Sequence, residues 1–164
     1  MLVVADTSPL NYLVWIDAVD ILPQLYGQVI IPSEVRAELL AADAPAVVQS
    51  WACNIPSWVE VCASDPVSRD DPRWHGLDLG ERAALALAAA RRPSIILMDE
   101  RTGTEIARDQ GFLVTGTLGV LDEAAHRKLI SLPNAIERLK RTSFRYPKAV
   151  VDRLLEEAAR RRSG

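Results

Sequence analysis

The feature that most constrains this chain is its alternation of short apolar runs with stretches of helical spacing. The apolar runs lie at residues 2–5, 28–31, 94–98 and 112–115, and residues 58–61 alternate as a short strand does. Each run is short enough to be a buried strand, and short connections join it to the helical stretch that follows. Strands that alternate with helices in this way form parallel sheets with right-handed crossovers. The pattern therefore predicts an α/β protein.

Composition narrows the class of protein further. The 164 residues are 49% hydrophobic but only 5% aromatic, which predicts one compact domain with a mainly aliphatic core. Cys53 and Cys62 lack the spacing of a zinc site or a disulfide framework, and a reducing cytoplasm suits them best. No basic segment precedes the first apolar run, and no apolar stretch is long enough to cross a bilayer. We therefore expect neither export nor membrane insertion.

Charge is unevenly distributed along the chain, although the net charge is only −3. From residue 127 onward, 11 Lys and Arg stand against 4 Asp and Glu, whereas the preceding residues hold 8 and 18. An acidic body could hold divalent cations, and a basic C-terminal segment could bind phosphates or an acidic protein partner. Ordinary solvated helix faces would produce the same imbalance.

Carboxylates follow two of the apolar runs directly. Asp6 ends the first run, and Asp99 and Glu100 end the run at residues 94–98. The carboxyl ends of parallel strands share the sheet edge at which ligands bind. Glu38 and Glu81 lie on expected helices that follow a strand and a loop, and they could converge on the same edge.

A cluster of this kind would have a clear chemical use. Carboxylates crowded in a cleft repel one another, and their pKa values rise unless a cation lies among them. Mg²⁺ or Mn²⁺ prefers oxygen ligands and keeps several waters, so substrate phosphate can complete its coordination. Such an ion orients and acidifies an attacking water, which suits phosphodiester hydrolysis.

Each acid also has a structural interpretation. Asp6 and Asp99 could cap the helices that follow them. Glu81 could form a reciprocal capping box with Asp78. Glu38 could be an ordinary solvated helix residue.

Hydroxyl groups accompany the acids. Thr7 and Ser8 could orient Asp6 or contact a metal-bound water. Thr115 and Thr117 flank a glycine where a strand meets a helix, a position that often binds phosphate.

Other chemistries find little support in the sequence. It contains neither a phosphate-binding Gly-x-x-x-x-Gly-Lys-Ser/Thr loop nor a Gly-x-Gly-x-x-Gly fingerprint. Its two histidines come without a Gly-x-Ser-x-Gly elbow, so Ser/His/Asp catalysis is not favoured. A receiver-type phosphoacceptor domain would need a pair of acids after the first strand and a basic residue closing the fifth, and both are missing.

Five segments in order form a more specific pattern. They are Val-Ala-Asp-Thr-Ser-Pro-Leu (4–10), Ile-Pro-Ser-Glu-Val-Arg-Ala-Glu-Leu (31–39), Leu-Gly-Glu-Arg-Ala-Ala (79–84), Leu-Met-Asp-Glu-Arg (97–101) and Val-Thr-Gly-Thr-Leu-Gly-Val-Leu (114–121). Together they resemble the PIN domain family, particularly the branch similar to VapC toxin ribonucleases. This resemblance implies a three-layer α/β/α sandwich with a parallel sheet of about four or five strands. It covers residues 1–130 as a nuclease domain and leaves residues 131–164 as a basic helical extension.

The resemblance also implies a function. An acidic cleft would bind Mg²⁺ or Mn²⁺ and cleave RNA, with an antitoxin partner and a homodimer as further expectations. Carried over residue by residue, the metal ligands and catalytic acids would be Asp6, Glu38, Glu81 and Asp99, with Thr7, Ser8, Glu100, Thr115 and Thr117 assisting. Whether Asp99 or Glu100 is the fourth ligand stays open. The alternative is a PIN fold that works as a binding module through its basic tail.

Overall fold

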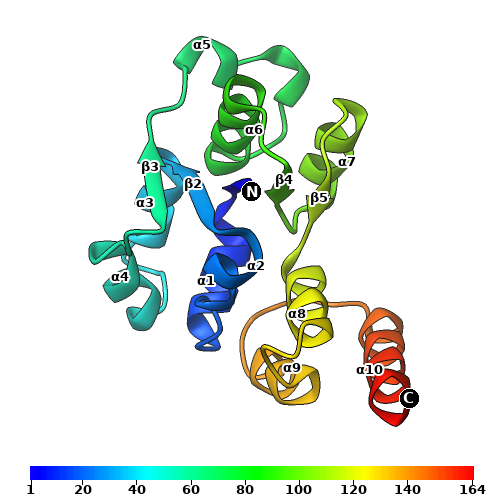
Figure 1. The fold of residues 1–164 in the computed structure, drawn as a ribbon. Coiled ribbons are helices and arrows are strands. Elements are labelled where there is room, and N and C mark those ends of the chain that lie inside the picture. Colours follow the sequence, from blue (N-terminus) through cyan, green and yellow to red (C-terminus); the bar gives the residue numbers. More distant parts are fainter.

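The fold is built around a five-stranded sheet in which every strand runs parallel to its neighbours (Figure 1). The computed structural model describes the backbone of residues 1–164 and every side chain except that of Val67. The strands are β1 (Leu2–Ala5), β2 (Gln28–Pro32), β3 (Val59–Cys62), β4 (Ile95–Leu97) and β5 (Val114–Thr115). Their order is β3-β2-β1-β4-β5, which places β1 in the middle of the sheet. The predicted α/β fold with a parallel sheet is confirmed.

Helices connect the strands and continue past the last one. They are α1 (Thr7–Trp15), α2 (Ile21–Tyr26), α3 (Ser33–Leu39), α4 (Ala46–Cys53), α5 (Pro66–Arg69), the 3₁₀-helix η1 (Pro72–Trp74), α6 (Leu79–Arg91), α7 (Arg101–Asp109), α8 (Thr117–His126), α9 (Leu132–Lys140) and α10 (Lys148–Ser163).

Side chains of the central strand alternate between two apolar layers. Val3 and Ala5 pack with side chains of α1, α2, α3, α4 and α8, whereas Val4 packs with side chains of α6 and α7. All three residues are fully buried, as expected for a parallel strand with helices on both faces. The sheet is therefore the middle layer of a three-layer sandwich, as predicted.

Residues 131–164 form α9 and α10, which pack against the body of the protein. Leu132, Ile136, Leu139 and Val151 are each at most 2% exposed and belong to the same apolar layer as Val3. Figure 1 shows α8, α9 and α10 gathered at one end of the molecule. The extension is thus held by the core, although a domain boundary near residue 130 remains a prediction.

The segment between β3 and α6 differs from expectation. Two prolines and few apolar residues over residues 64–76 predict an irregular loop, but the structure contains α5 and η1 there. The reason is Trp74, which is 2% exposed and packs into the layer that contains α6. Asp71 accepts a hydrogen bond from the backbone N–H of Arg73 (2.8 Å) and caps η1. Burial of one aromatic ring therefore orders part of a segment whose local composition predicts a loop.

Among the residues that the structure describes, no helix is both long and apolar enough to cross a membrane.

Candidate active site

Asp6 lies at the carboxyl end of β1, between β2 and β4. This is the point at which the order of an open parallel sheet reverses, and ligands bind in the crevice there. The backbone N–H of Asp6 donates to the carbonyl oxygen of Leu97 in β4 (2.9 Å), so its position is determined by the sheet. The side chain is only 3% exposed.

The carboxylate of Asp6 does not cap the helix that follows. Asp6 occupies the N-cap position of α1, yet its side chain makes no capping hydrogen bond. Its Oδ1 atom is buried and has no hydrogen-bond partner among the described residues. A buried carboxylate oxygen without a partner is costly, because it loses its hydration and gains nothing in return. Helix capping therefore does not explain this residue.

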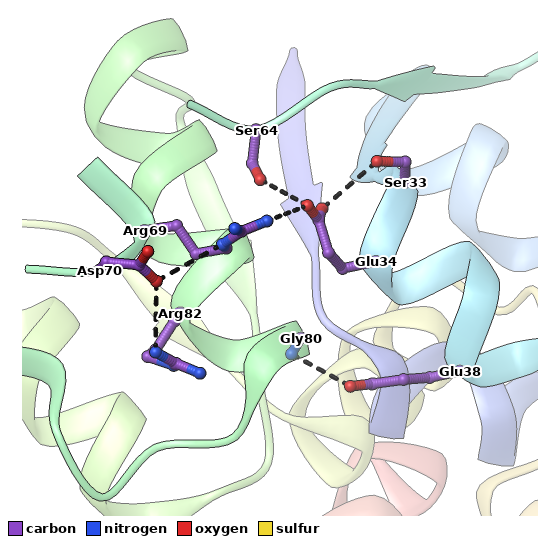
Figure 2. Close-up of polar contacts among 8 residues, drawn as sticks. All are labelled: Ser33, Glu34, Glu38, Ser64, Arg69, Asp70, Gly80 and Arg82. Atoms are coloured by element: carbon purple, nitrogen blue, oxygen red, sulfur yellow. Dashed lines mark hydrogen bonds and ion pairs between the residues drawn. The ribbon is translucent and has the colours of Figure 1, made fainter. Parts of the chain in front are cut away.

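Glu38 reaches Asp6's neighbourhood from the last turn of α3. One of its oxygens, Oε2, accepts the hydroxyl hydrogen of Thr7, and Oε1 accepts the backbone N–H of Gly80 (3.0 Å; Figure 2). A Cβ atom on Gly80 would collide with this carboxylate, so the close approach depends on glycine. Glu38 therefore links α1, α3 and α6, and is not a merely solvated helix residue.

Glu81 forms the capping box that its sequence spacing indicates. The backbone N–H of Glu81 donates to Oδ1 of Asp78 (2.8 Å), and Oε2 of Glu81 accepts the N–H of Asp78 (3.0 Å). Its side chain is nevertheless buried, with the residue 7% exposed. Burial, together with the charges of Asp78, Glu100 and Glu38, raises the pKa of Glu81 to about 7. Glu81 thus has a structural role and an unusual electrostatic environment at the same time.

Four carboxylates influence one another here, and we call Asp6, Glu38, Asp78 and Glu81 the acidic cluster. Burial raises the pKa of Asp6 well above its ordinary value, and the charges of the other three add to the effect. The backbone N–H of Thr7 offsets part of it. Burial and the charge of Asp78 likewise raise the pKa of Glu38, while its hydrogen bonds from Thr7 and Gly80 oppose the rise. The structure therefore brings three of the predicted acids together.

Asp99 is close in the chain to β4 but is held by another element. One oxygen, Oδ1, accepts the backbone N–H of Thr117 (2.7 Å), and Oδ2 accepts the hydroxyls of Thr117 (2.6 Å) and Ser8 (3.0 Å). A Cβ on Gly116 would come within 2.5 Å of Oδ1, so this contact also depends on glycine. Asp99 thus accepts hydrogen bonds at the N-terminus of α8, not that of α7, and Ser8 connects it to the first turn of α1.

The remaining predicted residues differ in their placement. Glu100 is the N-cap of α7 and accepts the N–H groups of Thr102 (2.9 Å) and Gly103 (2.6 Å). Its charge still contributes to the raised pKa of Glu81. The hydroxyl of Thr115 faces Gly119 in α8. The sequence allows Asp99 to cap the helix that follows it. In the structure Glu100 caps that helix, α7.

Two contributors to the cluster were not among the predicted site residues. Asp78 adds charge next to Asp6, and Gly80 supplies a backbone donor to Glu38. The sequence signal for both was the capping box that begins with Asp78. The capping box predicted from this spacing is correct, but it does not indicate that the charge of Asp78 also acts on Asp6.

A second polar network lies beside the cluster. Glu34 accepts hydrogen bonds from Ser64 (2.8 Å) and Arg69 (2.9 Å), and Asp70 pairs with Arg82 at 3.5 Å (Figure 2). The network attaches the segment between β3 and α6 to α3 and α6, next to the Glu38–Gly80 contact.

The carboxylates of this site have the chemistry of a divalent-ion site but not yet its geometry. As they are arranged, no three His, Cys, Asp or Glu side chains in the described part of the chain are grouped to hold one ion. Glu38 and Glu81 instead accept backbone N–H groups. The donor chemistry nevertheless fits, because the cluster offers hard carboxylate oxygens, the buried Oδ1 of Asp6 has no partner, and mutual repulsion favours a cation.

A family model described as PIN domain matches residues 2–160. The chain belongs to the PIN domain family. PIN domains are generally nucleases that bind divalent metals, so the acidic cluster lies in a nuclease-type fold. The match extends through α9 and most of α10, beyond the expected limit at residue 130. Neither the curated proteins nor the solved structures contained a match to the chain. Membership of the VapC-like branch remains a prediction.

Proposed function

We propose that this PIN domain is a metal-dependent endoribonuclease that hydrolyses RNA phosphodiester bonds at the acidic cluster. The observation that carries the proposal is the carboxylate of Asp6. It is buried at the reversal point of a parallel sheet, its Oδ1 has no hydrogen-bond partner among the described residues, and the charges of three further carboxylates act on it. A protein maintains such an arrangement at a cost in stability, which is typical of functional sites.

In this proposal Mg²⁺ or Mn²⁺ is the cofactor, with Asp6, Glu38, Glu81 and Asp99 as its carboxylate ligands. When bound, the ion would acidify an attacking water and neutralise charge on the phosphate. Asp6 is the central ligand because its Oδ1 atom has no hydrogen-bond partner among the described residues. Asp99 is preferred to Glu100, because Ser8 connects it to the start of α1 while Glu100 caps α7.

The hydroxyl residues would position the acids. Thr7 holds Glu38, and Ser8 and Thr117 hold Asp99, so each carboxylate has one defined orientation. Thr115 and Thr117 lie where β5 meets α8, and in the proposal this junction lies near the substrate phosphate.

RNA cleavage with purified protein tests the proposal. We expect cleavage of single-stranded RNA in Mn²⁺ or Mg²⁺, none in EDTA, and loss of at least about 100-fold in Asp6→Asn, since removal of one transition-state interaction costs on the order of 3 kcal/mol. Asp99→Asn should also lose cleavage. Asp109→Asn, at the exposed end of α7, removes the same charge and should cleave normally. Unchanged cleavage in Asp6→Asn would refute the assignment.

Calorimetry separates this function from the alternative, a PIN fold that binds RNA or protein without cleaving. A nuclease should bind Mn²⁺ at millimolar concentration or below, and Asp6→Asn should bind it more weakly. An absence of Mn²⁺ binding together with RNA binding would favour the binding module.

The biological setting is a proposal based on the resemblance. We propose that the protein is the toxin of a toxin–antitoxin pair, acts in the cytoplasm, binds an antitoxin protein and forms a homodimer. Co-expression with the product of an adjacent small reading frame tests this: the partner should form a stable complex and suppress cleavage.

A further inference from the structure

A small hollow opens beside Glu38, on the side of the molecule where α1 meets the segment between α9 and α10. Its volume is about 290 Å³, and Asn11, Trp15, Glu38, Asp43 and Ser143 line it. One hollow is therefore lined by a member of the acidic cluster, by a partly exposed tryptophan and by a residue of the C-terminal extension.

A second hollow is lined by the same tryptophan. Its volume is about 250 Å³, and its lining includes Trp15, Asp17, Arg138, Arg141 and Thr142. Trp15 belongs to both hollows and is 36% exposed. The two hollows thus meet at Trp15, with Glu38 in the lining of the first and two arginines in that of the second, and we call the surface from Glu38 past Trp15 to these arginines the path.

The ring of Trp15 is held in place by other aromatic residues. It stacks on Tyr12 with ring centroids 6.1 Å apart and an angle of 8° between the planes. Phe144 contacts Tyr12 edge-on at 4.9 Å, and the Tyr12 hydroxyl lies 3.1 Å from the Ser143 hydroxyl. The segment after α9 therefore holds Tyr12, on which the partly exposed ring of Trp15 stacks.

Charges along the path differ between its two ends. Near the cluster, Glu38 and Asp43 would repel phosphate and can accept hydrogen bonds from base amino groups. At the far end, Arg138 is anchored to the carbonyl oxygen of Ile16 (2.9 Å), and Arg141 takes part in no ion pair among the described side chains. Bases are thus favoured beside the acids, and backbone phosphate beside the arginines.

We infer that this path binds an unpaired RNA strand next to the proposed cleavage site, with a base stacked on Trp15 and a phosphate on Arg141. The inference rests on the proposed function and adds to it a base-binding position at Trp15, a phosphate-binding position at Arg141 and a role for residues 138–146. An aromatic ring on which bases stack, next to a positively charged surface, is the usual way in which proteins bind single strands without reading their sequence. A base-paired strand cannot offer a base to Trp15.

Fluorescence anisotropy with a labelled single-stranded RNA of mixed sequence, in EDTA, tests the stacking. Trp15→Ala should weaken binding about 5- to 100-fold, because one base–aromatic stack has an effect of this size. Trp15→Phe should retain most of the affinity. Leu113→Ala, which removes another exposed apolar side chain (70% exposed), should bind as the wild type does. A blunt RNA duplex should bind weakly, with no difference between wild type and Trp15→Ala.

A second measurement does not depend on a destabilising variant. Single-stranded RNA should quench the tryptophan fluorescence of the wild type, and Trp15→Phe should lose that quenching.

The salt dependence of binding tests the phosphate contact. Arg141→Gln should reduce the slope of log affinity against log salt by about 0.7, as expected for one lost phosphate contact to a single strand. Arg108→Gln, an exposed arginine in α7, makes the same change of charge as a control.

The outcomes distinguish this inference from the proposed function. Binding that is unchanged in both Trp15→Ala and Arg141→Gln overturns the path, even if Asp6→Asn abolishes cleavage. Binding that depends on Trp15 without any metal-dependent cleavage supports the path and contradicts the nuclease. Equal dependence of duplex binding on Trp15 would overturn the single-strand assignment. A wild type that binds no RNA but buries Trp15 against a co-expressed protein would also overturn it.

Discussion

Thr7 donates its hydroxyl hydrogen to Oε2 of Glu38, and this bond joins the first turn of α1 to the last turn of α3. The other oxygen of Glu38 accepts the N–H of Gly80 at the start of α6. Helices that follow β1, β2 and the segment after β3 therefore meet at one carboxylate. The site is assembled by these few polar contacts between elements that are distant in the sequence.

Thr7→Val removes the hydroxyl while keeping the shape of the side chain. It should lower the free energy of unfolding by about 1 kcal/mol, because Glu38 loses a charge-assisted hydrogen bond. Cleavage should fall as well, since the carboxylate is less well positioned. Urea unfolding and RNA cleavage are the measurements. Thr102→Val, at an exposed position in α7, serves as the control and should change neither.

Asp6→Asn should stabilise the metal-free protein while it abolishes cleavage. The wild-type carboxylate is buried near three other acids, with a raised pKa and an unpartnered oxygen. A neutral amide removes the repulsion, which we expect to raise the free energy of unfolding by about 1 kcal/mol at pH 8 in EDTA. Thermal unfolding measures this. A lower stability in Asp6→Asn would show that burial and charge repulsion at Asp6 do not destabilise the metal-free protein.

Stability of the metal-free protein should fall as pH rises from 5 to 8. The pKa of Glu81 is about 7 in the folded protein against an ordinary value of 4.5, so the folded state binds more protons than the unfolded state in this window. Removing those protons favours unfolding by on the order of 2 kcal/mol, a decrease in Tm of about 5 °C. Asp6 contributes in the same direction.

Glu81→Gln is the control for the pH effect. Glutamine can still accept the N–H of Asp78 and keep the capping box, but it does not titrate. The dependence on pH should become shallower in this variant. A saturating concentration of Mn²⁺ should also flatten it, because binding to the folded state offsets the repulsion. A Tm that rises between pH 5 and 8 in EDTA would contradict this account.

Gly80→Ala should weaken Mn²⁺ binding more than it affects folding. The added methyl group collides with the flexible carboxylate of Glu38, which must move. Alanine is otherwise the better helix residue, so the loss of stability should be below about 1 kcal/mol. Calorimetry should show Mn²⁺ affinity reduced about 10-fold, equivalent to about 1.4 kcal/mol. In a Glu38→Ala background, Gly80→Ala should cause no further loss, because the side chain with which it collides is missing.

Arg69→Gln should loosen the segment between β3 and α6. Arg69 bonds to Glu34 at 2.9 Å, with side-chain exposures of 23% and 14% (Figure 2). Chymotrypsin should then cleave residues 63–77 several-fold faster. Arg73→Gln is a matched control in the same segment, because its ion pair with Asp71 involves a 72% exposed arginine and contributes little. Equal cleavage rates in the two variants would show that the Glu34 network does not hold the segment.

Local sequence patterns predicted most of the fold but not the contacts of each acid. Apolar runs identified β1, β2, β4 and β5, because a strand with helices on both faces of its sheet is mostly apolar, whereas the alternating residues 58–61 identified the more exposed β3. Trp74 shows where this reasoning fails. Its neighbours indicate a loop, and only packing against α6 explains the ordered turns around it. The spacing of Asp78 and Glu81 predicted their capping box correctly, since that motif is local.

The sequence by itself determined that carboxylates follow β1 and β4 at the sheet edge, because the apolar run of each buried strand stops at an acid. Tertiary structure decided what each carboxylate contacts. Asp99 turns to the N-terminus of α8, Glu38 joins Thr7 to Gly80, and Oδ1 of Asp6 is left without a partner. These differences follow from the strand order, which places β1 between β2 and β4. That order depends on pairing between distant segments, and no local pattern of residues encodes it.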